Sequence, residues 1–347
     1  MSQTSQPKIA VFKPLPPDTL LRERYYIREL VAQGGQGSIY LAEDLRLDGR
    51  LCAVKEVNID AGASKEYQTQ IQEQFHREAS VLARLDHPNL PKVFDFFVYK
   101  ERDYLVMDYI SGRDLREVIE TARVKGDFIS EKQILEWASQ ILDALVYLHS
   151  QEPPIIHRDI KPANIKLVPN GPVKLVDFGL VKLMIPEDNR TITVLQGKGT
   201  VQYTPLEQYG GDSGHTDIRS DIYSLGATLF HLLTLTLPLE AKERFLYPKK
   251  KQSIRETNSK VSLKTETAVL HALSMHPNER PKDAEAFRDE LLGRRFFPRP
   301  NFIDFTAWWT EELQLAFAEN KTLLSIVAAF FALAVIITMF APTLPSP

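Results

Sequence analysis

The sequence contains a single cysteine and carries only a small net charge. Its 347 residues include one cysteine, Cys52, so no disulfide can form within the chain and no multi-cysteine zinc site is available. The formal net charge is −3, which gives no electrostatic case for a nucleic-acid partner. Residues 1–20 lack the apolar stretch of a signal peptide. These absences favour a reducing cytosol for most of the chain.

Long, strongly apolar runs are also scarce, and the clearest one lies near the end of the sequence. From Leu323 to Phe340 the chain reads LLSIVAAFFALAVIITMF, without a charged residue. A helix needs about 20 apolar residues to span a bilayer, and a buried core helix usually keeps a polar stripe that this run lacks. The run therefore predicts a single C-terminal transmembrane helix over residues 322–341, followed by a short tail at 342–347. The basic residues lie N-terminal to it, which places that side in the cytoplasm.

Two further segments are expected to lie outside the globular part. Residues 1–24 are polar and contain several prolines, which predicts a flexible N-terminal segment. Residues 294–321 are expected to form a juxtamembrane linker. Trp308 and Trp309 in that linker suit an interfacial helix or docking on the globular part, and the sequence leaves both open.

The central part of the chain changes from strand patterns to helix patterns. Apolar stretches separated by turn signals predict three antiparallel strands between Tyr25 and Val57, a helix over residues 66–85, and two more strands at KVFDFFVY and RDYLVMDYI. After about residue 114 the pattern is mostly helical, with an amphipathic helix at QILEWASQILDALVYLHS and a largely apolar one at SDIYSLGATLFHLLT. This order predicts an α+β protein of two lobes.

Two motifs in the strand-rich part carry groups suited to phosphate binding. The turn in AQGGQGSIYLA is rich in glycine, which lets backbone N–H groups approach phosphates, although such a turn is weak evidence by itself. Lys55 lies in the apolar strand CAVKEV. Taken alone it is most simply an edge-strand charge, but a partner such as Glu78 on the next helix would let it face phosphate oxygens.

A third motif, HRDIKPANIKL, combines an acid, a cation and an amide within a few residues. Asp159 could accept a hydroxyl proton, Lys161 could neutralise phosphate charge, and Asn164 could bind a hard metal ion. Asp177 follows in KLVDFGL, at a distance that allows a short strand–turn–strand between it and Asn164. Each motif alone is compatible with an ordinary turn, but their ordered combination is not.

In this order the motifs resemble those of the eukaryotic-type (Hanks-type) serine/threonine protein kinases of bacteria, as do GTVQYTPLEQY and HPNERP further on. The resemblance covers residues 25–293. It implies a two-lobed protein-kinase fold, with a small antiparallel sheet and one helix at 25–108 and a larger, mainly helical lobe at 109–293. It also implies transfer of the γ-phosphoryl group of ATP to Ser or Thr hydroxyls of proteins, with Mg²⁺ or Mn²⁺ as the metal.

The resemblance assigns roles to the residues that match its motifs. Asp159 and Lys161 are the catalytic pair, and Asn164 and Asp177 hold the metal. In the nucleotide site Lys55 pairs with Glu78. The full nucleotide-binding set is Ala32, Gly34, Gly35, Gly37, Ile39, Ala53, Lys55, Glu78, Met107, Asp108, Ile110 and Lys166.

Other roles implied by the resemblance are structural or regulatory. Glu207 pairs with Arg280, and Asp221 braces the catalytic loop. The hydrophobic column of the active state is formed by Leu82, His157 and Phe178. Thr200 positions the substrate. Arg158, beside Asp159, suggests control by phosphorylation of the activation loop, with Thr191 and Thr193 as candidate sites or as ordinary loop threonines.

Three positions depart from the family pattern. Ala32 stands where the first loop glycine is expected, which predicts a modest loss of nucleotide affinity. Pro205-Leu206-Glu207 replaces Ala-Pro-Glu but keeps the glutamate. Lys166 falls where an apolar residue normally lies under adenine. Its methylene stem could serve as that floor while its ammonium reaches water.

Three functions remain open on the sequence. An active kinase anchored to the membrane competes with a pseudokinase scaffold and with a small-molecule kinase of related fold. The complete catalytic set favours the active enzyme, and the PLE and SDIYSLG segments argue for protein substrates. The expected partners are ATP, proteins carrying Ser or Thr, and the lipid bilayer, with the span providing location or formation of a homodimer.

Overall fold

The computed structural model describes residues 13–34, 37–57, 64–169, 171–177, 201–209, 216–247 and 252–293. All of them belong to the unit Met1–Arg295, whereas residues 296–347 form a separate unit outside the described ranges. The predicted linker 294–321, span 322–341 and tail 342–347 therefore lie outside the described residues. Within the described ranges, no helix is long and apolar enough to cross a membrane.

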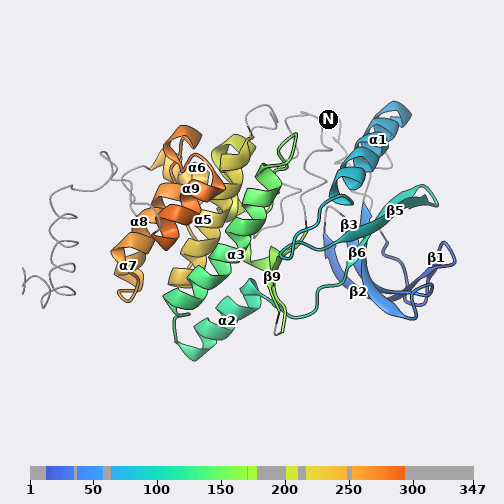
Figure 1. Cartoon of the computed structure of the whole chain (residues 1–347), viewed down its shortest axis with the longest axis horizontal. Coiled ribbons are helices and arrows are strands. Elements are labelled where there is room, and N and C mark those ends of the chain that lie inside the picture. Colours follow the sequence, from blue (N-terminus) through green and yellow to red (C-terminus); the bar gives the residue numbers. More distant parts are fainter. Residues whose placement is uncertain are drawn as a thin grey trace, which may run out of the picture. The chain divides into compact units, whose positions relative to one another are not determined.

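A six-stranded antiparallel sheet forms the first lobe, with strands in the order β1-β2-β3-β4-β6-β5. Figure 1 shows this lobe in blue to teal. Its strands are β1 (Leu20–Leu21), β2 (Tyr25–Gly34), β3 (Gly37–Asp44), β4 (Arg50–Val57), β5 (Val93–Tyr99) and β6 (Arg102–Asp108). Helix α1 (Lys65–Leu82) packs on one face, where Phe75 and Ala79 share a core with Val57 and Leu105. The predicted succession of three strands, a helix and two strands is confirmed.

Strand β4 is buried on both faces of the sheet, which explains its continuous apolar character. Alternate residues of a strand face opposite sides. Cys52 and Val54 belong to one hydrophobic cluster, and Val57 belongs to the other. Lys55 and Glu56 consequently point to opposite faces. Glu56, which is fully buried, accepts hydrogen bonds from the hydroxyls of Tyr40 (2.6 Å) and Tyr104 (3.0 Å).

The described N-terminal residues differ from the predicted flexible segment 1–24. Residues 13–24 are part of the fold and not a flexible segment, because β1 pairs with β2 and the Leu15 N–H donates to the Tyr40 hydroxyl at 2.9 Å. The reason is apolar burial: Leu21 is fully buried in the outer cluster, and Leu15 packs against it. Residues 1–12 lie outside the described ranges.

The second lobe is mainly helical (Figure 1). Its α-helices are α2 (Leu115–Lys125), α3 (Glu131–His149), α5 (Ile218–Thr234), α6 (Ala241–Leu246), α7 (Ile254–Thr257), α8 (Leu263–Ala272) and α9 (Ala284–Leu292). A small sheet at its edge contains β7 (Arg113–Asp114), β8 (Ile165–Leu167) and β9 (Val173–Leu175). Short 3₁₀ helices are η1 (Pro162–Asn164), η3 (Val201–Tyr203), η4 (Leu206–Gln208) and η6 (Pro277–Glu279).

Helices α3 and α5 form the centre of this lobe and match the two helices predicted there. Ser130 and Asp217 cap their N-termini by accepting hydrogen bonds from the backbone N–H groups of Gln133 and Arg219. Gly226 allows α5 to approach α8 closely, since a Cβ at this position would lie 2.9 Å from the Cβ of Ala272. Helix α5 is thereby a rigid, buried support for the loops described next.

Candidate active site

The inner face of the first lobe carries the predicted nucleotide-binding residues in two neighbouring rows. In the sheet register Ala32 lies opposite Ile39, and Ile39 lies opposite Lys55. In the next row Ala53 lies opposite Met107. The glycine-rich turn follows at the end of β2, where Gly34 pairs with Gly37, and Gly37 adopts a φ of 133°. Side chains that are far apart in the sequence therefore share one surface beneath this turn.

Lys55 makes its ion pair with Asp177, and not with the predicted partner Glu78, among the described residues. The Lys55 side chain is 5% exposed, and a cation buried to that extent requires a counter-charge. Asp177, whose φ is 63°, supplies that charge. Glu78 acts on a different cation: burial lowers the pKa of Arg158, and the charges of Asp221 and Glu78 oppose this shift. The expected Lys55–Glu78 pair is thus wrong for this conformation.

Asn164 and Asp177 converge, as their spacing predicted. The Asn164 carbonyl accepts a hydrogen bond from the N–H of Val176 at 2.8 Å, which brings Asn164 beside the residue before Asp177. Within the described residues, the side-chain amide of Asn164 makes its hydrogen bonds through Nδ2. Its Oδ1 and the Asp177 carboxylate, which also pairs with Lys55, are hard oxygen donors, a set that suits Mg²⁺.

The catalytic loop holds Asp159 in a cluster of directed bonds. The ammonium of Lys161 donates to Asp159 Oδ2 at 2.8 Å, and Asn164 Nδ2 donates to the same oxygen at 2.9 Å. Asn164 Nδ2 also donates to the Asp159 carbonyl at 2.8 Å. Asp159 and Asn164 are each 5% exposed. An acceptor carboxylate is consequently fixed beside a cation and an amide, as general-base chemistry at a hydroxyl requires.

Asp221 braces this loop from helix α5, as predicted. Its Oδ1 accepts from the Arg158 N–H and its Oδ2 from the His157 N–H, both at 2.8 Å. His149 Nε2 lies 3.0 Å from the same Oδ2. Burial disfavours the charged carboxylate, but these bonds and the nearby histidine charges outweigh it, so the pKa of Asp221 lies below its usual value. His149, in the last turn of α3, was not among the predicted site residues, because its contact with Asp221 depends on how α3 packs against α5.

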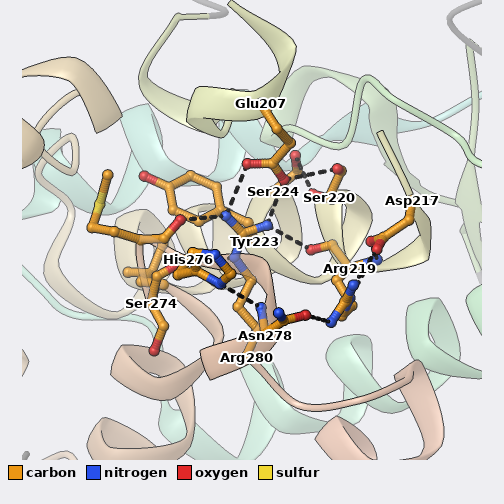
Figure 2. A network of polar contacts seen from close by, with 12 residues as sticks. Glu207, Asp217, Arg219, Ser220, Tyr223, Ser224, Ser274, His276, Asn278 and Arg280 are labelled. Atoms are coloured by element: carbon orange, nitrogen blue, oxygen red, sulfur yellow. Dashed lines mark hydrogen bonds and ion pairs between the residues drawn. The ribbon is translucent and has the colours of Figure 1, made fainter. Parts of the chain in front are cut away.

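Glu207 and Arg280 form the predicted ion pair within a larger polar network (Figure 2). Arg280 donates Nη1 to Oε1 at 2.6 Å and Nη2 to Oε2 at 3.0 Å, the two-pronged geometry that guanidinium and carboxylate favour. The hydroxyl of Ser220 donates to the same glutamate at 2.8 Å. The guanidinium also lies over the ring of Tyr223, 4.9 Å from its centroid. Helix η4 is thereby fixed to α5 and to the segment before α9.

The Lys166 ammonium lies at an exposed position, where it also binds a backbone carbonyl. Its Nζ donates to the backbone carbonyl of Gly112 at 3.2 Å, so it joins β8 to the segment that connects the lobes. Asp108 and Ile110 lie in the same connecting region, at the end of β6 and beyond it. Leu82 and His157 of the predicted column are both buried. Predictions for Gly35, Phe178, Thr191, Thr193 and Thr200 concern residues outside the described ranges.

Two bacterial protein kinases are similar in sequence to this chain over most of its length. The serine/threonine-protein kinase PksC of Streptomyces coelicolor is 35% identical over 282 residues, covering 78% of this chain and 48% of that protein. The serine/threonine-protein kinase PrkC of Bacillus subtilis is 32% identical over 299 residues, covering 84% of this chain and 44% of that protein. The chain thus spans less than half the length of each of these two relatives.

Solved structures agree on the fold. The apo form of PpkA-294 superimposes with a TM-score of 0.66 at 25% identity, over 80% of this chain and 99% of that one. The kinase domain of Mycobacterium tuberculosis PknI gives a TM-score of 0.61 at 22% identity, over 81% of this chain and 100% of that one. The protein kinase domain family matches residues 25–306. The chain therefore belongs to the protein kinase family.

Proposed function

We propose that this chain is an ATP-dependent serine/threonine protein kinase. The observation that carries the proposal is the convergence of Asp159, Lys161 and Asn164 with the Lys55–Asp177 pair. These groups come from three separate parts of the sequence, and each has the chemistry that phosphoryl transfer needs. The names and sequences of the bacterial relatives support Ser and Thr as the acceptors.

In the proposed reaction the substrate hydroxyl is positioned by Asp159. Its oxygen forms a bond to the γ-phosphorus of ATP, the bond to the bridging β-oxygen breaks, and the hydroxyl proton passes to the Asp159 carboxylate. Lys161 neutralises charge on the transferred group. A bound Mg²⁺ ion, held by Asn164 and Asp177, would supply further charge neutralisation at the phosphates.

Asp177 has two partners in this proposal, because the carboxylate that pairs with Lys55 is also the proposed metal ligand. Asp177 would hold the metal ion, and the Lys55 ammonium, buried beside it, would bind the α- and β-phosphates. Phosphorylation at Thr191 or Thr193, with Arg158 as the partner of the phosphate, is the regulatory step that we propose.

The function is tested by incubating the full chain, in detergent micelles, with γ-labelled ATP, Mg²⁺ and a generic protein rich in Ser and Thr. We expect label on phosphoserine or phosphothreonine and not on phosphotyrosine after hydrolysis. A matched reaction with excess EDTA should fall to background, because the proposed ligand set depends on a divalent ion. Equal incorporation in both reactions would exclude the metal-dependent mechanism, and background incorporation in both would favour a pseudokinase scaffold.

We further propose that residues 322–341 anchor the protein in a membrane as a single pass, with the kinase domain in the cytoplasm. The uncharged run from Leu323 to Phe340 supports this, since its length approaches that needed to cross the hydrocarbon core. The position of the basic residues supports the orientation.

Deletion of residues 322–347 tests the anchor. The truncated protein should move from the membrane fraction to the soluble fraction, while its phosphorylation of a soluble peptide stays within about twofold of the full chain, because the deleted residues contribute no group to the proposed catalytic set. Replacement of the run by an unrelated apolar span should restore membrane recovery. Recovery of the truncated protein in the membrane fraction, after a high-salt wash, would contradict the proposal.

A further inference from the structure

The segment that connects the two lobes, residues 108–114, is fastened at each end by a basic side chain from a neighbouring strand. We propose that these two residues, Arg50 and Lys166, are positioning residues for the nucleotide. They hold the connecting segment, which contains the predicted nucleotide-binding residues Asp108 and Ile110, in the geometry in which its backbone would receive adenine. This inference rests on the proposed function, because it assigns the way in which the same site holds ATP.

The first end is fixed at Asp108. Arg50 Nη2 donates to Asp108 Oδ1 at 2.6 Å, and the backbone N–H of Lys92 donates to Oδ2 at 3.0 Å. The Asp108 N–H in turn donates to the Lys92 carbonyl at 2.9 Å. Both carboxylate oxygens and the backbone N–H of this residue are thus engaged, which leaves little freedom at the point where the connecting segment leaves the sheet.

Arg50 is itself held in place. It stands at the start of β4, two positions before Cys52, which lies opposite Asp108 in the sheet register. Its guanidinium lies over the ring of Phe94 on β5, 4.6 Å from the centroid. A guanidinium over an aromatic face is attracted by the ring, which limits the movement of the Arg50 side chain. The residue therefore joins three strands at the place where the segment begins.

The second end is fixed at Gly112. A Cβ at this residue would lie 2.1 Å from the Leu167 carbonyl oxygen, so the backbone of the segment lies directly against β8. Its φ of 112° is one that side-chain-bearing residues rarely adopt. Lys166 Nζ donates to the Gly112 carbonyl at 3.2 Å. The next residues then pair with β8 as strand β7, with Asp114 opposite Lys166.

Between the two fastened ends, residues 109–111 belong to no helix or strand. Their backbone would be free to vary, and ordering a loop when a ligand binds costs conformational entropy. Side chains that order the segment beforehand reduce this cost, so Arg50 and Lys166 should increase affinity for the base without touching the phosphates. The family pattern with an apolar residue at position 166 could not make the second of these bonds.

The test measures equilibrium binding of ATP and of adenosine to the full chain in micelles. We expect Arg50→Ala and Lys166→Met each to raise both dissociation constants by about 3- to 10-fold. Adenosine carries no phosphate, so an equal loss for both ligands assigns the effect to the base and ribose and not to long-range attraction of phosphate. The KM for ATP should rise by the same factor, and kcat should change less than KM. Arg50→Lys should restore only part of the affinity, because an ammonium lacks the planar fork.

Two residues of this chain serve as matched controls. Arg28 pairs with Glu43 and lies over the ring of Tyr26 at 4.8 Å, which repeats the environment of Arg50 away from the connecting segment. Lys174 lies opposite Lys166 in the sheet and donates to the Leu90 carbonyl at 2.9 Å. Arg28→Ala and Lys174→Met remove the same charges and comparable bonds, and should leave adenosine binding unchanged.

The possible outcomes separate this inference from the function on which it rests. Unchanged adenosine and ATP affinity in Arg50→Ala and Lys166→Met would overturn the inference while leaving the kinase proposal intact. Equal losses in the control variants would also overturn it, because the effect would then be one of general stability. An unsubstituted chain that binds neither ligand would instead contradict the proposed function.

Discussion

Asp159→Asn is expected to lower kcat for protein phosphorylation by about 10²- to 10⁴-fold, the range that a positioned general base contributes. Asparagine has nearly the same shape, so the loop should keep its fold, but the amide cannot accept the hydroxyl proton. It also removes the negative partner of Lys161, whose ammonium lies 2.8 Å from Asp159 Oδ2. Dissociation constants for ATP should change by less than about threefold, because the base contacts are elsewhere.

Asp143→Asn is the matched control for this substitution. Asp143 makes an ion pair with Arg288 at 2.7 Å on the surface of the same lobe, where its side chain is 47% exposed. The chemical change is identical, yet kcat should remain within experimental error of the unsubstituted chain. A single-turnover measurement would separate the chemical step from product release. If Asp159→Asn kept more than a tenth of the parent rate, another residue would have to act as the base.

The alternation of apolar and polar residues was sufficient to predict the sheet and the main helices. Strand β4 illustrates why: its residues are buried on both faces, so CAVKEV had to be apolar apart from the two charges that have assigned partners. The N-terminal residues were assigned wrongly for the opposite reason. Prolines and polar residues suggested flexibility, but burial of Leu21, the pairing of β1 with β2 and the bond from the Leu15 N–H to the Tyr40 hydroxyl fix this segment.

Pairings between distant side chains were predicted less well than the residues themselves. The motifs located Lys55, Glu78 and Asp177 in the sequence, but they did not decide which carboxylate the lysine would contact. That choice depends on backbone conformation at Asp177 and on the competing charge of Arg158. Arg50 was missed because its partner Asp108 is 58 positions away and no local pattern links the two.

The sequence predicted the ion pair of Glu207 and Arg280, but it did not predict the other residues of the polar network around them. Ser220 and Tyr223 join it because one face of α5 passes beside Arg280, which follows from the position of that helix and not from any motif. The network also shows why PLE can replace the usual APE: the hydrogen bonds of Glu207 to Arg280 and Ser220 come from its carboxylate, and neither Pro205 nor Leu206 takes part in them.

Glu207→Ala should lower the free energy of unfolding by about 3–5 kcal/mol, the range observed when one partner of a buried ion pair is removed. The Arg280 side chain is fully buried and Glu207 is 8% exposed, so the remaining guanidinium would keep its charge without a counter-ion. Its bonds to the carbonyls of Ser274 and Met275 would persist. We therefore expect a folded variant near the lower end of this range, measured by urea unfolding.

A double-mutant cycle completes this prediction. Arg280→Met should also destabilise, because the carbonyls that it serves lose their donor, but Glu207→Ala combined with Arg280→Met should cost less than the sum of the single changes by at least about 1 kcal/mol. The surface pair of Asp143 and Arg288 provides the comparison, and Asp143→Ala should cost only about 0.2–1 kcal/mol. Additive losses at Glu207 and Arg280 would contradict the coupling.

Because η4 follows the segment that would meet a protein substrate, Glu207→Ala should also raise KM for that substrate more than KM for ATP, whose proposed contacts lie in the other lobe and in the catalytic loop.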